Sequence, residues 1–487
     1  MSFDPDHFDR RVEQSRRENA TKRAAEVRAK PNGAARPRLQ PVYAARPPAF
    51  SDDALALRFA ERHANDLRFV AAWNKWLSWT GKRWEFDETL AAFDKSRAIC
   101  REAAAACNKS KIAVALASSK TVAAVEKLAK ADRRIAATID QWDADPWLLN
   151  TPDDVVDLRT GRTRTHRADD YMTKITAVGP RGDCPRFLAF VNRITGGDVA
   201  LVSYLQRVLG YALTGVTREH ALFFAYGTGA NGKSVLLSTV AGILGEYHRT
   251  APIETFVASN GDRHPTDLAG LRGARLVTAT ETEEGRRWAE ARIKQLTGGD
   301  TVSARFMRQD FFEYRPAFKL VIAGNHKPSL RSVDEAIRRR FHMIPFAVTI
   351  PVDERDVELV EKLKAEWPGI LAWLIEGCLE WQAEGLRPPQ AVLEATDAYL
   401  SAEDAIAAWI DDRCERDPSA WISSSDLFTS WKAWADASGE QAGSMKRLTQ
   451  TLETRGFHRH KMNRGQGFYG LRVKPEEAST LSWETRK

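Results

Sequence analysis

Short apolar runs recur through the middle of the chain, separated by polar or glycine-containing segments. Such runs are typical of strands buried in a sheet. They lie at residues 221–225, 276–279, 318–323 and 343–346. Residues 235–244, after the first run, space their apolar side chains as a helix does. The pattern therefore predicts an α/β core over residues 186–350.

The two ends of the chain carry little apolar surface. Residues 1–51 mix basic and acidic side chains and then become rich in proline, and residues 476–487 form a polar tail. We expect the first segment to be a disordered arm, because it cannot bury enough apolar surface to fold. Its basic residues either contact nucleic acid or are simply solvated.

Residues 52–185 predict a smaller N-terminal α/β domain. A helix begins near Asp52, and residues 73–84 alternate aromatic and polar side chains as a hairpin does, with Gly81 near the turn. An alanine-rich helical stretch follows at 88–140. We expect the tryptophans to form the core of a small sheet rather than a surface that stacks on bases.

The region after the α/β core predicts helices and then a mixed domain. Residues 351–415 have helical spacing. Within residues 416–475, helices at 423–438 and 444–455 precede two strands that flank a turn at 463–465. This is the outline of a winged helix with a basic side. Such domains bind duplex DNA or mediate protein contacts, and both alternatives stay open.

Composition narrows the class of protein. The 487 residues are 43% hydrophobic and carry a net charge of +7, with a pI of about 9.1, which suits a polyanionic partner. The five cysteines form no C-x-x-C pair, so a zinc site or a disulfide framework is not expected. No apolar run reaches the ~18 residues of a membrane span. We therefore expect a cytoplasmic protein with no membrane partner.

The segment between the first strand and its helix carries a phosphate-binding motif. It reads Gly227, Thr228, Gly229, Ala230, Asn231, Gly232, Lys233 and Ser234, which fits G-x-x-x-x-G-K-S. In this motif backbone N–H groups surround phosphate oxygens, the lysine reaches the β- and γ-phosphates, and the serine hydroxyl binds Mg²⁺. The sequence therefore predicts that the protein binds ATP and Mg²⁺.

Hydrolysis needs further polar groups at the ends of neighbouring strands. Glu281 follows the strand at 276–279 directly, which makes it the expected general base, and Glu283 is the alternative. Thr280 stands where many such enzymes place a metal-binding aspartate, and with Ser234 and Glu281 it completes the expected Mg²⁺ set. We also expect this strand to lie beside the phosphate-binding strand.

Two more polar features follow the later strands. Asn325 lies at the tip of the strand at 318–323 and could orient the attacking water, although an ordinary turn asparagine is an equal alternative. Three arginines, residues 338–340, precede the strand at 343–346. In a ring ATPase one such arginine stabilises charge in a neighbour's site, and Arg340 is the expected one. The alternative is a solvated helix end.

Basic and aromatic residues between these strands suit a single-stranded nucleic acid. Lys294, Arg305 and Arg308 could meet the phosphate backbone while Phe306 stacks on a base. In the C-terminal domain the candidate DNA contacts are Lys446, Arg447 and Arg464.

Together, these motifs resemble the superfamily 3 helicases, in particular the helicase part of the phage, plasmid and poxvirus-type primase-helicases. The resemblance rests on G-T-G-A-N-G-K-S, T-E-T-E, K-Q-L-T-G-G-D, A-G-N-H-K-P and D-E-A-I-R-R-R-F, and on D-P-W-L-L-N-T-P before them. It implies an AAA+-like core with a parallel sheet and flanking helices, and a homo-oligomeric ring, usually a hexamer. The positions that match the family's functional residues are Lys233, Ser234, Glu281, Asn325 and Arg340.

The resemblance also implies an ATP-dependent helicase that moves 3′ to 5′ on single-stranded or forked DNA and replicates a phage, plasmid or other mobile element. Residues 1–51 leave no room for a primase, so we expect helicase activity without primase activity, with a separate primase as a potential partner. Two alternatives stay open. One is a loader that assembles on DNA without unwinding it, and the other is an initiator that binds an origin.

Overall fold

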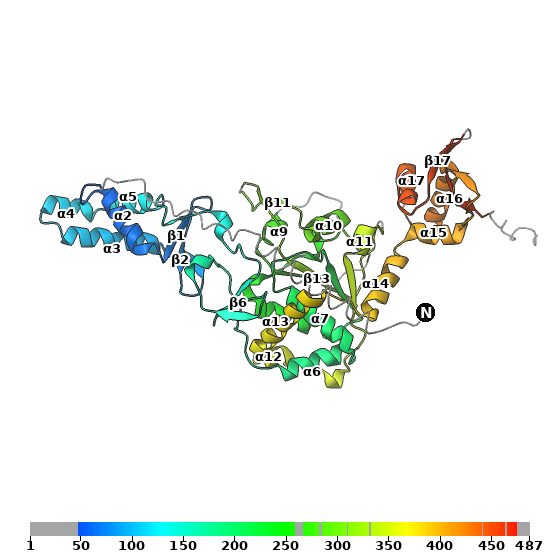
Figure 1. Ribbon diagram of the computed structural model, residues 1–487, viewed down its shortest axis with the longest axis horizontal. Helices are drawn as coiled ribbons and strands as arrows, with labels where there is room; N and C mark the ends of the chain where they lie inside the picture. The colour runs from blue at the N-terminus through cyan, green and yellow to red at the C-terminus, as the bar shows by residue number, and fades with distance from the viewer. Residues whose placement is uncertain are drawn as a thin grey trace, which may run out of the picture. The chain divides into compact units, whose positions relative to one another are not determined.

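The structure is a computed structural model that describes residues 47–258, 266–281, 285–308, 310–330, 333–440, 442–462 and 465–474. The chain forms two compact units (Figure 1). The described part of the first comprises residues 47–63 and 90–134, and the second contains residues 64–89 and everything described after residue 134. The predicted disordered arm lies almost entirely outside the described residues.

The first unit is a helical bundle. Its helices are α2 (Asp52–His63), α3 (Ala91–Ala105), α4 (Ser110–Leu116) and α5 (Ser119–Ala129). Helix α2 packs on α3 and α5 through the buried side chains of Leu55 and Phe59. These helices bury their apolar faces against one another and form a unit of their own. The predicted domain over 52–185 stays a prediction.

An aromatic sheet opens the second unit. Its strands are β1 (Leu67–Val70), β2 (Lys75–Trp79), β3 (Trp84–Phe86) and β4 (Ala136–Ala137), in the order β3-β2-β1-β4. Trp84 is 1% exposed, and its indole N–H donates to the carbonyl of Ala168 at 2.8 Å. Gly81 has a φ of 95° in the turn between β2 and β3. The predicted hairpin and the predicted role of the tryptophans as core residues are both confirmed.

A second small sheet lies between this region and the central α/β core along the chain. It contains β5 (Leu148–Asn150), β6 (Val155–Asp157) and β7 (Arg162–Arg164), which pair antiparallel. Before it, Asp143 accepts from the backbone N–H of Thr173 at 2.8 Å and forms an ion pair with Lys174, also at 2.8 Å. This pairing lowers the pKa of the Asp143 carboxyl against the opposing effect of burial.

Five parallel strands form the central sheet. They are β8 (Leu222–Tyr226), β9 (His248–Thr250), β10 (Leu276–Glu281), β13 (Lys319–Gly324) and β14 (Phe341–Pro345). Their order is β14-β8-β13-β10-β9, and every pairing is parallel. The expectation that the strand at 276–279 lies beside the phosphate-binding strand is wrong, because β13 lies between them. The two strands still end at the same edge.

Helices cover one face of this sheet and enclose a large core. They are α6 (Pro185–Ile194), α7 (Val199–Tyr211), α8 (Lys233–Leu244), α12 (Leu359–Lys364) and α13 (Trp367–Glu384). Helices α7 and α13 approach closely at two glycines. A Cβ on Gly210 would lie 2.2 Å from the backbone nitrogen of Cys378. One on Gly377 would lie 2.2 Å from the carbonyl oxygen of Gln206, so neither position has room for a side chain.

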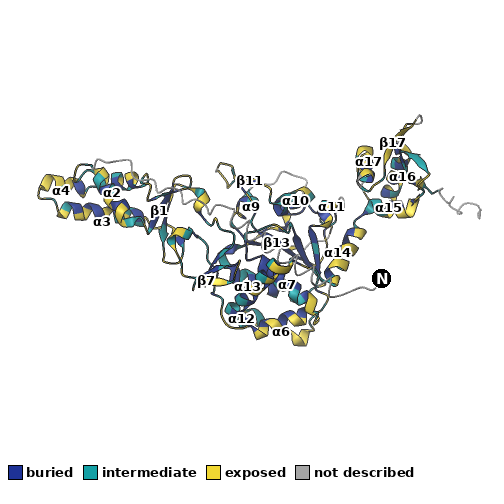
Figure 2. Cartoon of the chain, viewed as in Figure 1, coloured by how far each residue is buried: buried dark blue, intermediate teal, exposed yellow. Residues whose placement is uncertain are grey.

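The other face carries a second core beneath shorter elements. These are α9 (Thr266–Ala269), α10 (Glu290–Gly298), the hairpin of β11 (Val302–Ala304) and β12 (Phe312–Tyr314), α11 (Glu335–Arg338) and α14 (Gln390–Ala402). Phe224, Trp288, Phe341 and Tyr399 pack their rings against one another here. Figure 2 shows the central strands buried between these layers.

The C-terminal elements form a small domain with its own core. It contains α15 (Ala405–Arg413), β15 (Cys414–Glu415), β16 (Trp421–Ser423), α16 (Ser424–Ala437), α17 (Met445–Thr454), β17 (Arg459–Met462), β18 (Gly465–Tyr469) and β19 (Arg472–Val473). The predicted pair of helices followed by a hairpin is present. The assignment as a winged helix stays a prediction.

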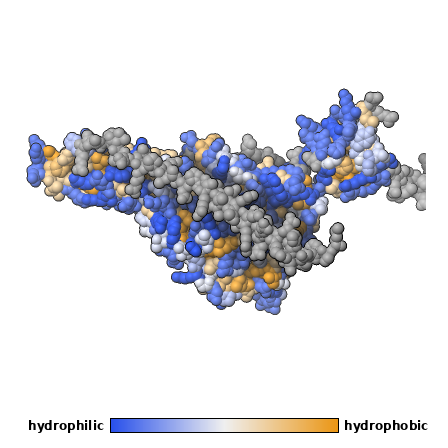
Figure 3. All heavy atoms as spheres, in the orientation of Figure 1, coloured by the Kyte–Doolittle hydropathy of each residue, from blue (hydrophilic) through white to orange (hydrophobic). Residues whose placement is uncertain are grey.

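Hydrophilic residues occupy much of the molecular face drawn in Figure 3. Among the residues that the structure describes, no helix is both long and apolar enough to cross a membrane.

Candidate nucleotide-binding site

The phosphate-binding loop connects β8 to α8 at the edge where the parallel strands end. Its backbone has a φ of 96° at Gly229, 49° at Ala230 and 80° at Gly232. Backbone in this region turns successive N–H groups toward one concave side, which makes a site for an anion. A Cβ on Gly232 would lie 2.4 Å from Cγ2 of Ile194, so this position also excludes a side chain for lack of space.

Lys233 begins α8 and is buried, with 6% of its surface exposed. Its Nζ donates to the carbonyl of Gly227 at 2.9 Å, to Oδ1 of Asn231 at 3.0 Å and to Oδ1 of Asn325 at 3.4 Å. Burial lowers the pKa of its ammonium group. The contact with Asn325 joins two parts of the predicted site that are 92 residues apart in sequence.

Asn231 has a structural role that the motif alone did not reveal. Its side chain is 3% exposed, and its Nδ2 donates to the carbonyl of Phe346 at 3.2 Å while its Oδ1 accepts from Lys233. The backbone N–H of Ile350 donates to the carbonyl of Ala230 at 2.8 Å. The segment after β14 therefore holds the loop in place, and Asn231 contacts both this segment and Lys233.

The predicted metal-binding residues lie at the same edge of the sheet. Ser234 is exposed in the first turn of α8, and Thr280 is exposed near the end of β10. Glu281 ends β10 opposite Gly324, directly before Asn325. The side chain of Glu281 and all of Glu283 lie outside the described residues, so the choice of general base stays a prediction.

These residues fit ATP and Mg²⁺. The loop offers a concave backbone, a buried lysine amine and the start of a twelve-residue helix, which are the groups that bind triphosphate oxygens. The hydroxyls of Ser234 and Thr280 are oxygen ligands of the type that Mg²⁺ prefers.

The three arginines before β14 have different surroundings. Arg340 is 7% exposed, and it donates through Nε to Oγ1 of Thr297 at 3.2 Å and through a terminal nitrogen to the carbonyl of Ala336 at 2.7 Å. Burial lowers the pKa of its guanidinium. The guanidinium that we expected to reach a neighbouring subunit is thus held inside its own chain.

The two preceding arginines are exposed, but only one of them has a charged partner. Arg338 lies 3.5 Å from a carboxylate oxygen of Asp404. The side chain of Arg339 makes no hydrogen bond or ion pair with any residue that the structure describes. Arg339 is therefore the arginine of this turn that is free to contact another molecule, and the sequence alone could not distinguish it.

Three of the predicted DNA contacts lie on or beside the β11–β12 hairpin. Phe306 is 41% exposed and stacks on Phe312 with ring centroids 5.8 Å apart, and Arg305 lies 4.6 Å over the ring of Phe311. Arg308 is exposed, with a φ of 60°. The sequence did not predict this hairpin or the exposure of Phe311.

The remaining DNA candidates divide into three groups. Lys294 forms an ion pair with Asp334, so its charge is already compensated within the chain. Lys446 is exposed at the start of α17, and Arg447 next to it is partly buried. Arg464 lies outside the described residues.

A glycine-rich loop at the edge of a five-stranded parallel sheet, with the asparagine that follows the adjacent strand touching the loop lysine, is the arrangement expected of a P-loop nucleotide-binding domain. Comparison with known families makes the assignment more specific. The family described as D5 N terminal like matches residues 56–196, and a family of unknown function, DUF5906, matches residues 225–340. These matches support the resemblance of the chain to the D5-like superfamily 3 helicases.

Two curated viral proteins are similar to part of the chain. Helicase L207/L206 of Acanthamoeba polyphaga mimivirus is 25% identical over 319 residues, which covers 60% of this chain and 33% of the viral protein. Helicase 022R of Frog virus 3 (isolate Goorha) is 25% identical over 289 residues, covering 55% and 29%. The chain thus spans about a third of the length of these relatives.

Solved structures of the NrS-1 C-terminal region also align with the chain. One apo structure has a TM-score of 0.49 and 12% identity, and covers 87% of this chain and 100% of its own. An A-form apo structure has a TM-score of 0.45 and 11% identity, with the same coverage.

Proposed function

We propose that the protein is an ATP-dependent DNA helicase that assembles as a ring, translocates 3′ to 5′ on single-stranded DNA and replicates a phage, plasmid or other mobile element. The observation that carries the proposal is the contact between the Nζ of Lys233 and Oδ1 of Asn325 at 3.4 Å. The contact supports the proposal because hydrolysis of the terminal phosphate requires a phosphate-binding cation and a water-orienting group close together.

The roles of the residues follow from their positions. Lys233 binds the β- and γ-phosphates, and the backbone of residues 227–232 surrounds the phosphate oxygens. Ser234 and Thr280 would hold Mg²⁺, which would neutralise the charge that develops on the phosphates. Asn325 orients the attacking water, and Glu281 accepts the proton of that water.

A second subunit would complete the site with Arg339. This arginine replaces Arg340 as our candidate, because the Arg340 guanidinium is buried and bonded to Thr297 and Ala336. A cation delivered from a neighbour stabilises transition-state charge, and its loss lowers kcat by about 10³- to 10⁵-fold in other phosphoryl-transfer enzymes.

The β11–β12 hairpin supports the assignment of a DNA substrate. Its loop combines exposed Phe306, Met307 and Phe311 with Arg305 and Arg308. Exposed rings next to guanidinium groups match what a single strand offers, because bases stack on rings and phosphates attract cations. The C-terminal domain would supply a further, duplex-binding surface through Lys446.

The proposal is tested by measuring ATP hydrolysis and strand separation on forked DNA. We expect Lys233→Ala to abolish both activities. Arg339→Ala should abolish hydrolysis while ATP binding, measured with a fluorescent nucleotide, is retained. Wild-type hydrolysis that DNA stimulates without any strand separation would refute the helicase and favour a loader. Negative-stain images of monomers in the presence of ATP and single-stranded DNA would refute the ring.

A further inference from the structure

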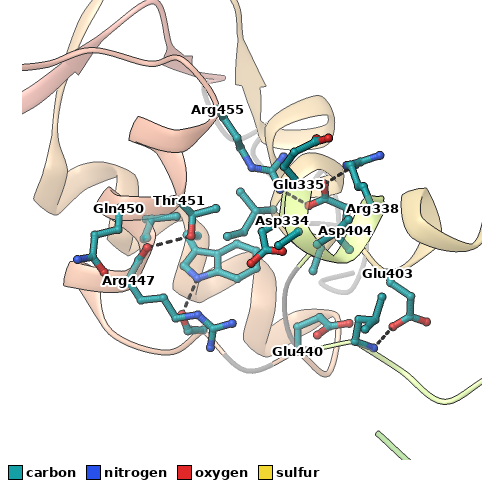
Figure 4. A pocket seen from close by; sticks show the side chains of 18 residues that line it. Asp334, Glu335, Arg338, Glu403, Asp404, Glu440, Arg447, Gln450, Thr451 and Arg455 are labelled. Carbon is teal, nitrogen blue, oxygen red and sulfur yellow. Dashed lines mark hydrogen bonds and ion pairs between the residues drawn. The ribbon is translucent and has the colours of Figure 1, made fainter. Parts of the chain in front are cut away.

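Asp404 lies where α14 ends and α15 begins, and it joins the ATP-binding core to the C-terminal domain. Figure 4 shows it at the margin of a cavity of about 710 Å³. Residues of α11, of the α14–α15 joint and of α17 line this cavity. The cavity therefore borders both the C-terminal domain and the turn at residues 338–340, which we call the arginine turn.

The carboxylate of Asp404 has three partners from three elements. It caps α15 by accepting from the backbone N–H of Ala407 at 3.1 Å. One oxygen forms an ion pair with Arg455, at the end of α17, and the other lies 3.5 Å from Arg338, at the end of α11. Asp404 itself is only 5% exposed. A buried carboxylate is tolerated when it is paired in this way.

The same end of α14 also holds the segment that follows Asn325. The hydroxyl of Tyr399 donates to the carbonyl of Pro328, and Oε2 of Glu403 accepts from the backbone N–H of Leu330 at 2.7 Å. The α14–α15 joint therefore contacts the segment that follows Asn325 and the turn that carries Arg339, which are two of the parts of the chain with proposed catalytic groups.

Arg339 lies between two arginines that are fixed at their side chains. Arg338 is held by Asp404, and Arg340 is held by Thr297 and the carbonyl of Ala336. A single exposed arginine between two anchored ones has a restricted direction, because the backbone on both sides is fixed. Without Asp404 the anchor on the Arg338 side is lost, and Arg339 can no longer be aimed reproducibly.

We infer that Asp404 is a positioning residue for the proposed arginine of the neighbouring site, and that it links the direction of Arg339 to the placement of the C-terminal domain. The inference rests on the proposed function, since it requires that Arg339 acts on a second subunit. A helix cap alone would not need the charge, because asparagine caps a helix as well as aspartate does.

The substitution Asp404→Asn separates the two roles, since it keeps the cap and removes the negative charge. We expect kcat for ATP to fall by about 10- to 100-fold, the order of effect produced by misplacing a catalytic group by about 1 Å. KM for ATP should change by less than about two-fold, because the subunit's own phosphate-binding loop is intact. Arg455→Gln should shift kcat in the same direction by removing the partner on α17.

The matched control is Asp198→Asn. Asp198 also caps a helix, accepting from Ala200 at 2.9 Å and Leu201 at 3.0 Å, but it has no arginine partner among the described residues. We expect kcat of this variant to equal that of the wild type. An equal loss in both variants would show that capping, and not charge, is responsible, and would overturn the inference.

Subunit mixing provides a readout that a merely structural defect would not produce. Lys233→Ala subunits lack hydrolysis but keep an intact arginine turn, whereas Asp404→Asn subunits keep an intact loop. The two variants are mixed in equal amounts before ATP and DNA are added. If they assemble at random, about a quarter of the interfaces combine the intact loop of an Asp404→Asn subunit with the intact arginine turn of a Lys233→Ala subunit. We expect the mixture to hydrolyse ATP faster than either variant alone.

A reference mixture of Lys233→Ala with Arg339→Ala tests the trans role of Arg339 separately from the positioning role of Asp404. If the reference mixture regains no activity, the proposed trans role of Arg339 fails. If the reference mixture regains activity and the mixture with Asp404→Asn does not, Asp404 does not act through the arginine turn, and the inference is overturned while the proposed function stands.

Discussion

Lowering the pH should destabilise the central α/β core through one histidine. His342 is in β14, with its Nδ1 2.7 Å from the hydroxyl of Tyr204 and its ring stacked on the tyrosine ring at 6.1 Å. Phe223 packs on the ring at 5.3 Å. Burial lowers the pKa of His342 from 6.5 to about 4. The folded chain therefore holds this imidazole in its neutral form.

The magnitude follows from the two pKa values. The unfolded chain protonates the ring near pH 6.5, and the folded chain does so only near pH 4. Between these values the unfolded state binds more protons, so stability is lost as the pH falls through this window. At pH 5.5 the loss from this group is about 1.4 kcal/mol relative to neutral pH, since one pKa unit corresponds to about 1.36 kcal/mol.

The assay is urea unfolding, followed by tryptophan fluorescence, of the wild type and of His342→Gln at pH 7.5 and pH 5.5. Glutamine keeps a polar partner for Tyr204 and does not titrate, so the wild type should lose about 1.4 kcal/mol more between the two pH values than the variant. Other groups that titrate in both proteins, including His248, cancel in the comparison. An identical pH dependence of the two proteins would refute the reasoning.

Three further predictions concern the loop, the core and the hairpin. Gly232→Ala should abolish ATP binding, measured by fluorescence titration, because its Cβ would lie 2.4 Å from Ile194. A Cβ at Gly229 meets open space, so Gly229→Ala should lose only part of the affinity, through the strain of an alanine at a φ of 96°. Lys319→Met should lower the urea midpoint of unfolding without changing the affinity for ATP. The buried amine of Lys319 donates to the carbonyls of Thr214, Val216 and Ala317, so its removal leaves these carbonyls unpaired and should cost about 3 kcal/mol of stability. In fluorescence anisotropy with single-stranded DNA, Arg308→Gln should reduce the salt slope of log K by about 0.7. Phe306→Ala should weaken binding by about 1–3 kcal/mol at an unchanged slope, and the reverse pattern would contradict the assigned roles.

Local chemistry was readable from the sequence, and long-range placement was not. The loop at 227–234 is contiguous, so its motif predicted the turn and the helix that follows it, whereas the burial of Lys233 came only from the structure. The position of β13 between β8 and β10 was not predictable, because a run of apolar residues marks a buried strand without naming its neighbours.

The sequence also could not predict which arginine of residues 338–340 is buried and which is exposed. Residues 338–340 are chemically identical in the sequence. Which of them is buried depends on where α11 ends and β14 begins, and these boundaries differ from any periodicity signal by a residue or two. Only the surroundings, Thr297 for Arg340 and Asp404 for Arg338, separate their roles.

The division of the N-terminal region has a consequence for how the protein is synthesised and shortened. Helix α2 belongs with α3 and α5, yet strands β1, β2 and β3 come between them in the chain. During translation the apolar side of α2 stays uncovered until α3 and α5 have been synthesised, and β1, β2 and β3 are made before them. A shortened protein that begins after His63 would keep β1, β2 and β3 but lose the helix on which α3 and α5 pack. A fragment that includes these strands and helices should therefore begin before α2.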